Sequence, residues 1–225
     1  MKKIRISREL TFIISILANS LAFNLLLNAN FGMSCMSSFP YVLSQITDVI
    51  SIGMMNFIIQ TITLIVMMLI TKKFSLYYAL SFGVGFIFGL LADGWGLLFK
   101  NFSNLVSLRI LFFICGWIIL ALSIAGFQRC DMPLMPFDVV TRDITKARKK
   151  EYSKVKSTID IIFVLLSLTS SFIFFSKMVG VGFGTIFQAL VTGKFVGLLL
   201  KCFDKHIEEY TKTKAGEFFY KIKAI

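Results

Sequence analysis

The 225-residue sequence lacks most of the residue patterns on which enzymes and metalloproteins depend. It has four cysteines without a CxxC pair and one histidine, His206, so neither a disulfide framework nor a zinc site is expected. Gly-x-Ser-x-Gly, His-Glu-x-x-His and Walker motifs do not occur. The sequence therefore predicts a protein without catalytic activity, metal or cofactor.

Charged residues are scarce and apolar residues are abundant. Only 16% of the residues are charged and 56% are hydrophobic, whereas a soluble domain is roughly 25% charged and about 45–50% apolar. Several apolar runs approach the roughly 20 residues that cross a bilayer. The first run follows a basic segment but lacks a small-x-small cleavage site, so we expect a retained helix. The sequence predicts a multi-pass membrane protein, with the lipid bilayer as its surroundings.

Hydropathy indicates six spans within a single all-α membrane domain, residues 1–225. The predicted spans are residues 10–27, 50–70, 76–98, 105–127, 157–176 and 183–200. With this count, all 24 lysines and arginines except Lys100, Arg109, Lys177 and Lys194 fall on one side. Because cytoplasmic loops carry the excess of basic residues, both termini are expected in the cytoplasm.

The net charge of +12 lies in short segments between spans, so a nucleic-acid partner is not expected. The basic loop at residues 146–156 is interpreted as a topology anchor at anionic headgroups, with a specific lipid or protein site as the alternative. The tail, residues 205–225, is expected to include a short amphipathic helix at the membrane interface.

Residues 83–94 and 182–193 resemble one another at a constant offset of 99 residues. The segments around Pro40 and Pro136 match at a similar offset, and chance similarity is the alternative reading. We interpret the chain as two three-span repeats, roughly residues 1–103 and 104–204. Because three is odd, the second repeat must be inverted relative to the first.

The segments around Pro40 and Pro136 are too short and too broken to span the membrane. Each is expected to form either a short surface helix or a re-entrant element. The segment from Pro136 to Asp138 is predicted to act as a gate on the cytoplasmic side, and the Pro40 segment lies on the outer side.

Polar residues inside spans are the candidate solute or coupling residues, because a charge there costs roughly 2.5–3.5 kcal/mol on insertion scales. Asp93, Lys194 and Thr192 are predicted to gather where the third and sixth spans meet. The candidate partners of Asp93 are Lys194 and Arg109, and a buried Asp93–Lys194 pair would be either a structural clamp or part of a solute site. Gln60 and Asp160 fall at about corresponding positions of the two repeats. Gln60 is expected to form a helix–helix hydrogen bond rather than a solute contact. Asp160 is expected either to belong to the site or to lie in water near the end of its span.

Small residues in the spans predict close helix packing, with a local helix break as the alternative. The packing candidates are Gly83, Gly85, Gly89, Gly182 and Gly184. The small-xxx-small spacing of Ala18 and Ala22 favours a helix partner from a second copy or from another membrane protein.

With these residues in place, the chain resembles the YczE/YyaS/YitT-type family of bacterial multi-pass membrane proteins over nearly its whole length. The resemblance rests on Gly32-Met33-Ser34 with residues 39–45, on residues 56–60, on Phe88-Gly89 with Asp93, on residues 136–139, and on residues 182–185 with Gly193. No Asp accompanies Pro40 as Asp138 accompanies Pro136, which departs from a symmetric pattern. The resemblance implies a bacterial plasma-membrane protein and supplies no substrate.

The leading functional hypothesis is a small secondary transporter or permease for a small solute. Inverted repeats, ionisable residues inside spans and the lack of an ATP-binding motif favour it. One alternative is a substrate-capture subunit of a larger transporter. The other is a non-transporting scaffold or regulator of another membrane protein.

Overall fold

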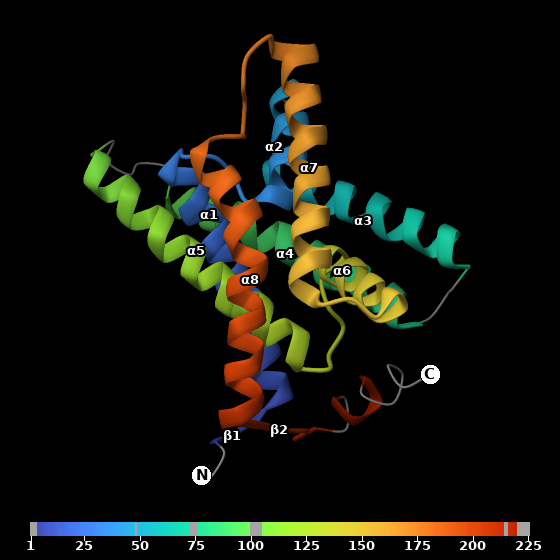
Figure 1. The fold of residues 1–225 in the computed structure, drawn as a ribbon. Helices are drawn as coiled ribbons and strands as arrows, with labels where there is room; N and C mark the ends of the chain where they lie inside the picture. The colour runs from blue at the N-terminus through green and yellow to red at the C-terminus, as the bar shows by residue number, and fades with distance from the viewer. Residues whose placement is uncertain (1–3, 48, 73–75, 100–104, 214–215, 220–225) are drawn as a thin grey trace.

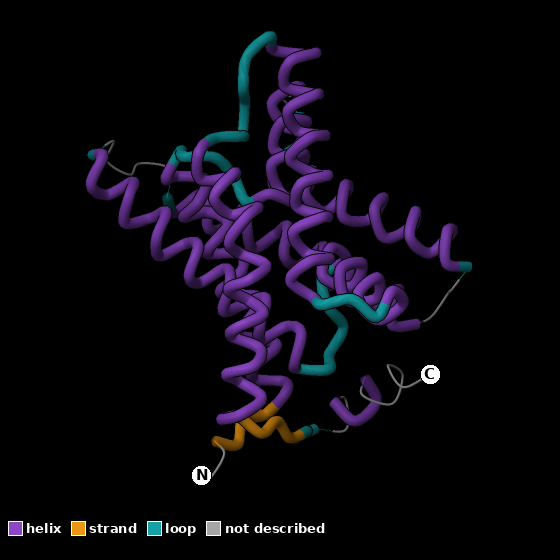
Figure 2. Tube along the Cα trace, viewed as in Figure 1, coloured by secondary structure: helices purple, strands orange, loops and turns teal. Residues whose placement is uncertain are grey.

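The computed structural model of the protein describes residues 4–47, 49–72, 76–99, 105–213 and 216–219. Within these residues the fold is almost entirely helical (Figures 1 and 2). Six of the helices are long and apolar enough to cross a membrane, which confirms the prediction of six candidate spans. Seven lysines of the charge pattern above lie outside the described residues, namely Lys2, Lys3, Lys73, Lys100, Lys214, Lys221 and Lys223.

The long helices enclose two short ones. The long helices are α1 (Arg8–Ala29), α3 (Ile52–Thr71), α4 (Leu76–Leu98), α5 (Val106–Arg129), α7 (Tyr152–Phe175) and α8 (Phe183–His206). The short helices are α2 (Cys35–Ile46), between α1 and α3, and α6 (Pro136–Arg148), between α5 and α7.

Residues 207–210 of the predicted tail form a strand, whereas residues 216–219 are helical. β1 (Ile4–Ser7) and β2 (Ile207–Tyr210) form a parallel two-stranded sheet in which Ile4 pairs with Ile207. The sheet therefore holds the beginning of α1 beside the end of α8 (Figure 1).

The outer surface of the long helices carries large apolar side chains. Ile14, Leu90, Leu165 and Leu190 are each at least half exposed. Exposed apolar surface on this scale marks contact with lipid or another apolar partner. The exposure agrees with a membrane protein whose helices face hydrocarbon.

α1 and α5 form the central helix crossing, where small residues let the two backbones approach. Ala22, predicted to mark a partner helix, is completely buried in this crossing. A Cβ on Gly116 would lie 3.0 Å from Leu25 Cβ, and a Cβ on Gly126 would strike Ser15 Oγ. Early residues of α1 thus face late residues of α5, so the two helices run antiparallel (Figure 1).

The second half of the chain buries the same helix faces as the first. Buried residues 55, 56, 59 and 60 of α3 match buried residues 155, 156, 159 and 160 of α7. Residues 84, 85, 88, 89 and 92 of α4 match 184, 185, 188, 189 and 192 of α8. Residues 19, 20, 22 and 23 of α1 match 120, 121, 123 and 124 of α5. The buried faces therefore coincide at an offset of 100 or 101 residues.

For α4 and α8 this offset differs by one residue from the predicted offset of 99. One residue turns a helix face by about 100°, so the correspondence of side chains changes. At an offset of 100, Asp93 aligns with Gly193 and Lys194 with Gly94, whereas at the predicted offset of 99 Asp93 aligns with Thr192.

Each short helix packs along a long helix of the other half. α2 lies against α7, and α6 lies against α3 (Figure 1). Both short helices are largely buried, so neither is a surface helix, which was one of the two predicted alternatives. Pro136 opens α6, where its fixed φ suits the first turn. Pro40 lies inside α2, which Cys35 opens, so the two prolines are not equivalent in the structure.

Candidate functional site

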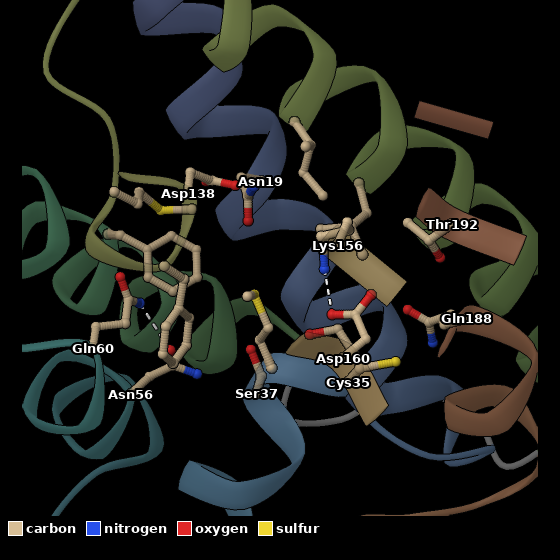
Figure 3. A pocket seen from close by; sticks show the side chains of 17 residues that line it. Asn19, Cys35, Ser37, Asn56, Gln60, Asp138, Lys156, Asp160, Gln188 and Thr192 are labelled. Atoms are coloured by element: carbon tan, nitrogen blue, oxygen red, sulfur yellow. Dashed lines mark hydrogen bonds and ion pairs between the residues drawn. The ribbon is translucent and has the colours of Figure 1, made fainter. Parts of the chain in front are cut away.

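A cavity of about 50 Å³, walled by polar and apolar side chains, lies where α2 and α6 begin, and each of the eight helices named above contributes to its wall. Figure 3 shows the ion pair of Lys156 and Asp160 next to Cys35, with Asn56 and Gln60 on the opposite side of Ser37. The wall residues come from both halves at matching positions. Residues 34, 36 and 37 match 135, 137 and 138, residues 56 and 60 match 156 and 160, residue 88 matches 188, and residue 19 matches 120; Pro136 is not a wall residue.

The N-termini of both short helices point toward this cavity. The caps of α2 and α6, Ser34 and Met135, make no side-chain hydrogen bond to the first turn. Among the described residues, no hydrogen bond is found for the backbone N–H groups of Cys35, Met36 and Phe137. Unpaired N–H groups give a helix N-terminus a partial positive charge. The cavity therefore receives the positive ends of two helix dipoles.

The two halves place one bonded pair each on the cavity wall, and the pairs differ in charge. On α3, Gln60 Nε2 donates to Asn56 Oδ1 at 2.9 Å. On α7, Lys156 and Asp160 occupy the matching positions, one helical turn apart, and Lys156 Nζ donates to Asp160 Oδ1. The side chains of Lys156 and Asp160 are only 6% and 1% exposed. The first half thus contributes a neutral pair and the second half an ion pair.

Several polar atoms on the wall have no hydrogen-bond partner among the described residues. They are Asn56 Nδ2, Gln60 Oε1, Asp160 Oδ2 and both amide atoms of Gln188. All four side chains are about 99% buried. A buried polar atom without a partner costs roughly 1–3 kcal/mol. Such atoms around a small cavity indicate a place where a polar solute or water completes the bonding.

Asp138 adds a second carboxyl group to the wall, in the first turn of α6. It is 3% exposed, and its side chain has no hydrogen bond or ion pair within the described part of the chain. Burial raises the pKa of Asp138 to about 6, although the charge of Lys156 acts to lower it. Ser37 occupies the matching position on α2. The carboxyl group of Asp138 can therefore gain and lose a proton near neutral pH.

A buried cluster of Tyr77, Tyr78, Arg142 and Asp143, called the latch here, ties α6 to α4. Tyr77 Oη donates to Met132 O at 2.7 Å and accepts from Arg142 Nη1 at 2.6 Å. Arg142 Nε and Tyr78 Oη both donate to Asp143, each at 2.8 Å. The latch therefore fixes α6 and the α5–α6 connection.

A second cavity, of about 270 Å³, lies between the α1–α2 and α7–α8 connections. Tyr41, Phe31 and Met178 are among its wall residues. At the offsets given above, its wall residues Tyr41 and Met178 align with Arg142 and Tyr78 of the latch. The two ends of the fold thus differ, since one is tied by the latch and the other is hollow.

The structure does not bring Asp93 and Lys194 together. Asp93 Oδ2 accepts from Ser51 Oγ at 2.5 Å and Oδ1 from Gly53 N at 2.9 Å, so the carboxylate caps α3. Lys194 is exposed on the outside of α8, and no ion pair involves it among the described residues. The proposed meeting of the third and sixth spans is also wrong, because α4 and α8 are not close neighbours.

Arg109, the other predicted partner of Asp93, binds the end of α1 instead. Its Nε donates to Ala29 O at 2.9 Å and its Nη2 to Asn30 O at 3.0 Å. Carbonyl groups at a helix C-terminus favour such a cation.

The remaining predicted site residues divide between the cavity and its support. Thr192, Gln60, Asp160 and Asp138 line the cavity, whereas Pro40 does not. Thr192 Oγ1 accepts from Trp117 Nε1 at 3.1 Å.

Four of the five predicted packing glycines lie at close approaches. A Cβ on Gly85 would lie 3.1 Å from Pro136 at the start of α6, and one on Gly89 would lie 2.8 Å from Gly53 O. Gly182 and Gly184 lie against the backbone of Phe31. Gly83 faces open space, because no atom of the described residues lies within 4 Å of a Cβ built there, so the predicted close packing is not seen at this position.

Sequence reasoning missed the cationic member of the site, Lys156, because it was counted in a basic loop. α7 in fact begins at Tyr152, which places Lys156 inside the helix. The spacing of four residues between Lys156 and Asp160, repeated by Asn56 and Gln60 earlier in the chain, is the signal that could have found it. Gln188 carried the same signal, because it lies four residues before Thr192 inside an apolar span, whereas Cys35 had no such signal.

The fold and the cavity define a multi-pass helical membrane protein with a buried polar centre. Residues 6–201 match DUF6198, a family of unknown function, and the chain belongs to this family. No curated protein and no solved structure matches the chain. The family match is compatible with the expected uncharacterised multi-pass membrane family, while the resemblance to YczE/YyaS/YitT-type proteins stays a prediction.

Proposed function

We propose that the protein is a secondary transporter for a small polar solute in a bacterial plasma membrane, and that the central cavity is its solute site. The observation that carries the proposal is the cavity wall, which takes matching positions from both halves and contains buried polar atoms without partners. Transporters with inverted repeats hold their solute at the repeat interface, beside the ends of broken helices. α2 and α6 correspond to such broken elements.

The repeats are proposed to be inverted. The antiparallel crossing of α1 and α5 and the shared buried faces support this relation. A further support is that each close contact in the crossing has a counterpart, since Ser15 and Gly126 correspond to Gly116 and Leu25. With the basic segments in the cytoplasm, the termini and the latch lie on the cytoplasmic side, and the larger cavity lies on the outer side.

In this arrangement α6 is the cytoplasmic gate, and the described conformation is the one closed to the cytoplasm. The latch holds the gate through Tyr77 and Arg142. Opening requires that the latch breaks while the outer cavity closes around Tyr41. Alternating access then follows from exchange between two packings of equivalent halves.

The experiment is a solute screen on the purified protein in lipid nanodiscs, followed by flux measurements in proteoliposomes. A solute that binds the folded state raises its apparent stability by mass action. We expect at least one small polar solute to stabilise the protein and to cross the proteoliposome membrane only when the protein is present. Lys194→Gln, outside the cavity, is the control.

Stabilisation without flux would replace the proposal with a capture subunit, whose energising partner is absent from the liposome. Neither stabilisation nor flux from any solute would overturn it in favour of a scaffold.

A further inference from the structure

We propose that the central cavity binds a small monovalent anion together with one proton on Asp138, an inference that rests on the proposed transport function of the same cavity. It names the chemical class of the solute and the group that couples it to protons.

The size of the cavity limits the solute to a few atoms. One water needs roughly 10–15 Å³ of such space, and the cavity offers about 50 Å³. It therefore accommodates about three or four water-sized groups, which is the size of formate, nitrite or nitrate. A sugar or an amino acid requires a larger space than this conformation provides.

The donors around the cavity favour negative charge. The free N–H groups of Cys35, Met36 and Phe137 stand at two helix N-termini, which are anion-binding ends of helices. Independent support comes from side chains, because Asn56 Nδ2 and Gln188 Nε2 are buried donors without a partner. Lys156 supplies a full positive charge next to them, although Asp160 shares it. An anion can satisfy all three kinds of donor at once.

The protonation state of Asp138 controls whether an anion can enter the cavity. Lys156 neutralises Asp160, which leaves the charge of Asp138 without a salt-bridge partner within the described structure. A negative Asp138 repels an anion in the same cavity, whereas a protonated one does not. Protonation of Asp138 and entry of the anion therefore favour each other, and by linkage each raises the affinity for the other.

The surroundings of Asp138 allow this proton to come and go. From α7 it faces Lys156, Asp160 and Tyr152, and from its own helix Arg142. α3 adds only the neutral pair of Asn56 and Gln60, α2 adds the Cys35 thiol, and α4 adds the apolar Phe88. Tyr77 of α4 binds Arg142. Because burial raises the pKa of Asp138 to about 6, the proton is bound below that pH and lost above it. Anion affinity should consequently fall as the pH rises.

The test measures the melting temperature of the nanodisc protein against concentrations of sodium formate, nitrite, nitrate and chloride at pH 5.5 and 7.5. Sodium gluconate keeps the ionic strength constant. We expect saturable stabilisation by at least one of these anions, with an apparent affinity about 20-fold weaker at pH 7.5, since the protonated fraction of a group with pKa near 6 falls by that factor.

Asp138→Asn removes the titrating group and should bind the anion equally at both pH values. Asp138→Ser, which copies Ser37 from the matching position of α2, is the second variant in case the first fails to fold. Lys194→Gln should behave like the wild type. An unchanged pH dependence in both Asp138 variants would overturn the proton assignment.

Other solutes separate this inference from the transport proposal. Ammonium, guanidinium, urea and glycine are tested in the same way. If one of them stabilises the protein through Asp160 and no anion does, the anion inference fails and the transport site stands. If no solute of either set stabilises the protein, both fail.

Discussion

The two bonded pairs on the cavity wall allow the structural role of the ion pair to be separated from its binding role. Lys156→Asn with Asp160→Gln converts the α7 pair into the neutral pair that α3 already carries as Asn56 and Gln60. Each single substitution leaves one charge buried without its partner, which typically costs about 3–5 kcal/mol. The double variant leaves no unpaired charge, and its amides can bond as the α3 amides do at 2.9 Å.

We therefore expect each single variant to lose about 3–5 kcal/mol of unfolding free energy and the double variant to lie within about 1 kcal/mol of the wild type. Binding should behave differently. A hydrogen bond to a charged group contributes about 1.5–3 kcal/mol, so loss of the Lys156 ammonium group should weaken solute binding at least about tenfold in the double variant.

The assay is unfolding of the nanodisc protein by titration with SDS, with and without the stabilising solute. A double variant as unstable as the single ones would refute the equivalence of the two pairs. A double variant that binds the solute as tightly as the wild type would refute a binding role for the ion pair.

Three further changes test the rest of the account. Gly53→Ala should destabilise the protein by about 1–3 kcal/mol because a Cβ there would strike Gly89 O. The control Gly83→Ala should change the unfolding free energy measured in SDS by less than about 0.5 kcal/mol. Equal effects of the two substitutions would contradict the described α3–α4 contact. Tyr77→Phe removes the hydroxyl group that binds Arg142 and Met132. It should therefore weaken the latch and increase the rate of proteolysis in the α5–α6 connection about tenfold. An unchanged cleavage rate would show that the latch does not hold α6. Asp93→Ala removes the carboxylate that binds Ser51 and Gly53 at the start of α3, so it should cost about 0.5–2 kcal/mol while solute affinity stays the same. Lost affinity at normal stability would return Asp93 to the site.

The membrane-spanning segments could be predicted from the sequence because hydropathy over a whole span does not depend on the neighbours of any one residue. The site could be predicted only in part. Gln60, Asp160 and Thr192 carry their polarity into an apolar helix, which is visible in the sequence. Whether such a side chain points into the protein depends on which face of its helix packs against the other helices.

Asp93 and Lys194 show why the face matters. The predicted repeat alignment used an offset of 99, whereas the buried faces of α4 and α8 coincide at an offset of 100. One residue turns a helix face by about 100°, so the two offsets align different side chains. Asp93 also has a structural use that depends on Gly53 and Ser51 in another helix. No spacing within its own segment indicates that contact, so its capping role could not be predicted.

The central claim is that the cavity opens to water and to solute, and Cys35 on its wall is a native reporter. In the Cys115→Ala/Cys130→Ala/Cys202→Ala background, its reaction with a small membrane-impermeant methanethiosulfonate is measured in proteoliposomes of defined orientation. The Sγ of Cys35 is buried and donates to Thr185 O at 3.3 Å in this conformation, so reaction requires opening. The account predicts reaction from either side of the membrane, slowed by the solute that stabilises the protein. A folded protein in which Cys35 stays unreactive from both sides would contradict it.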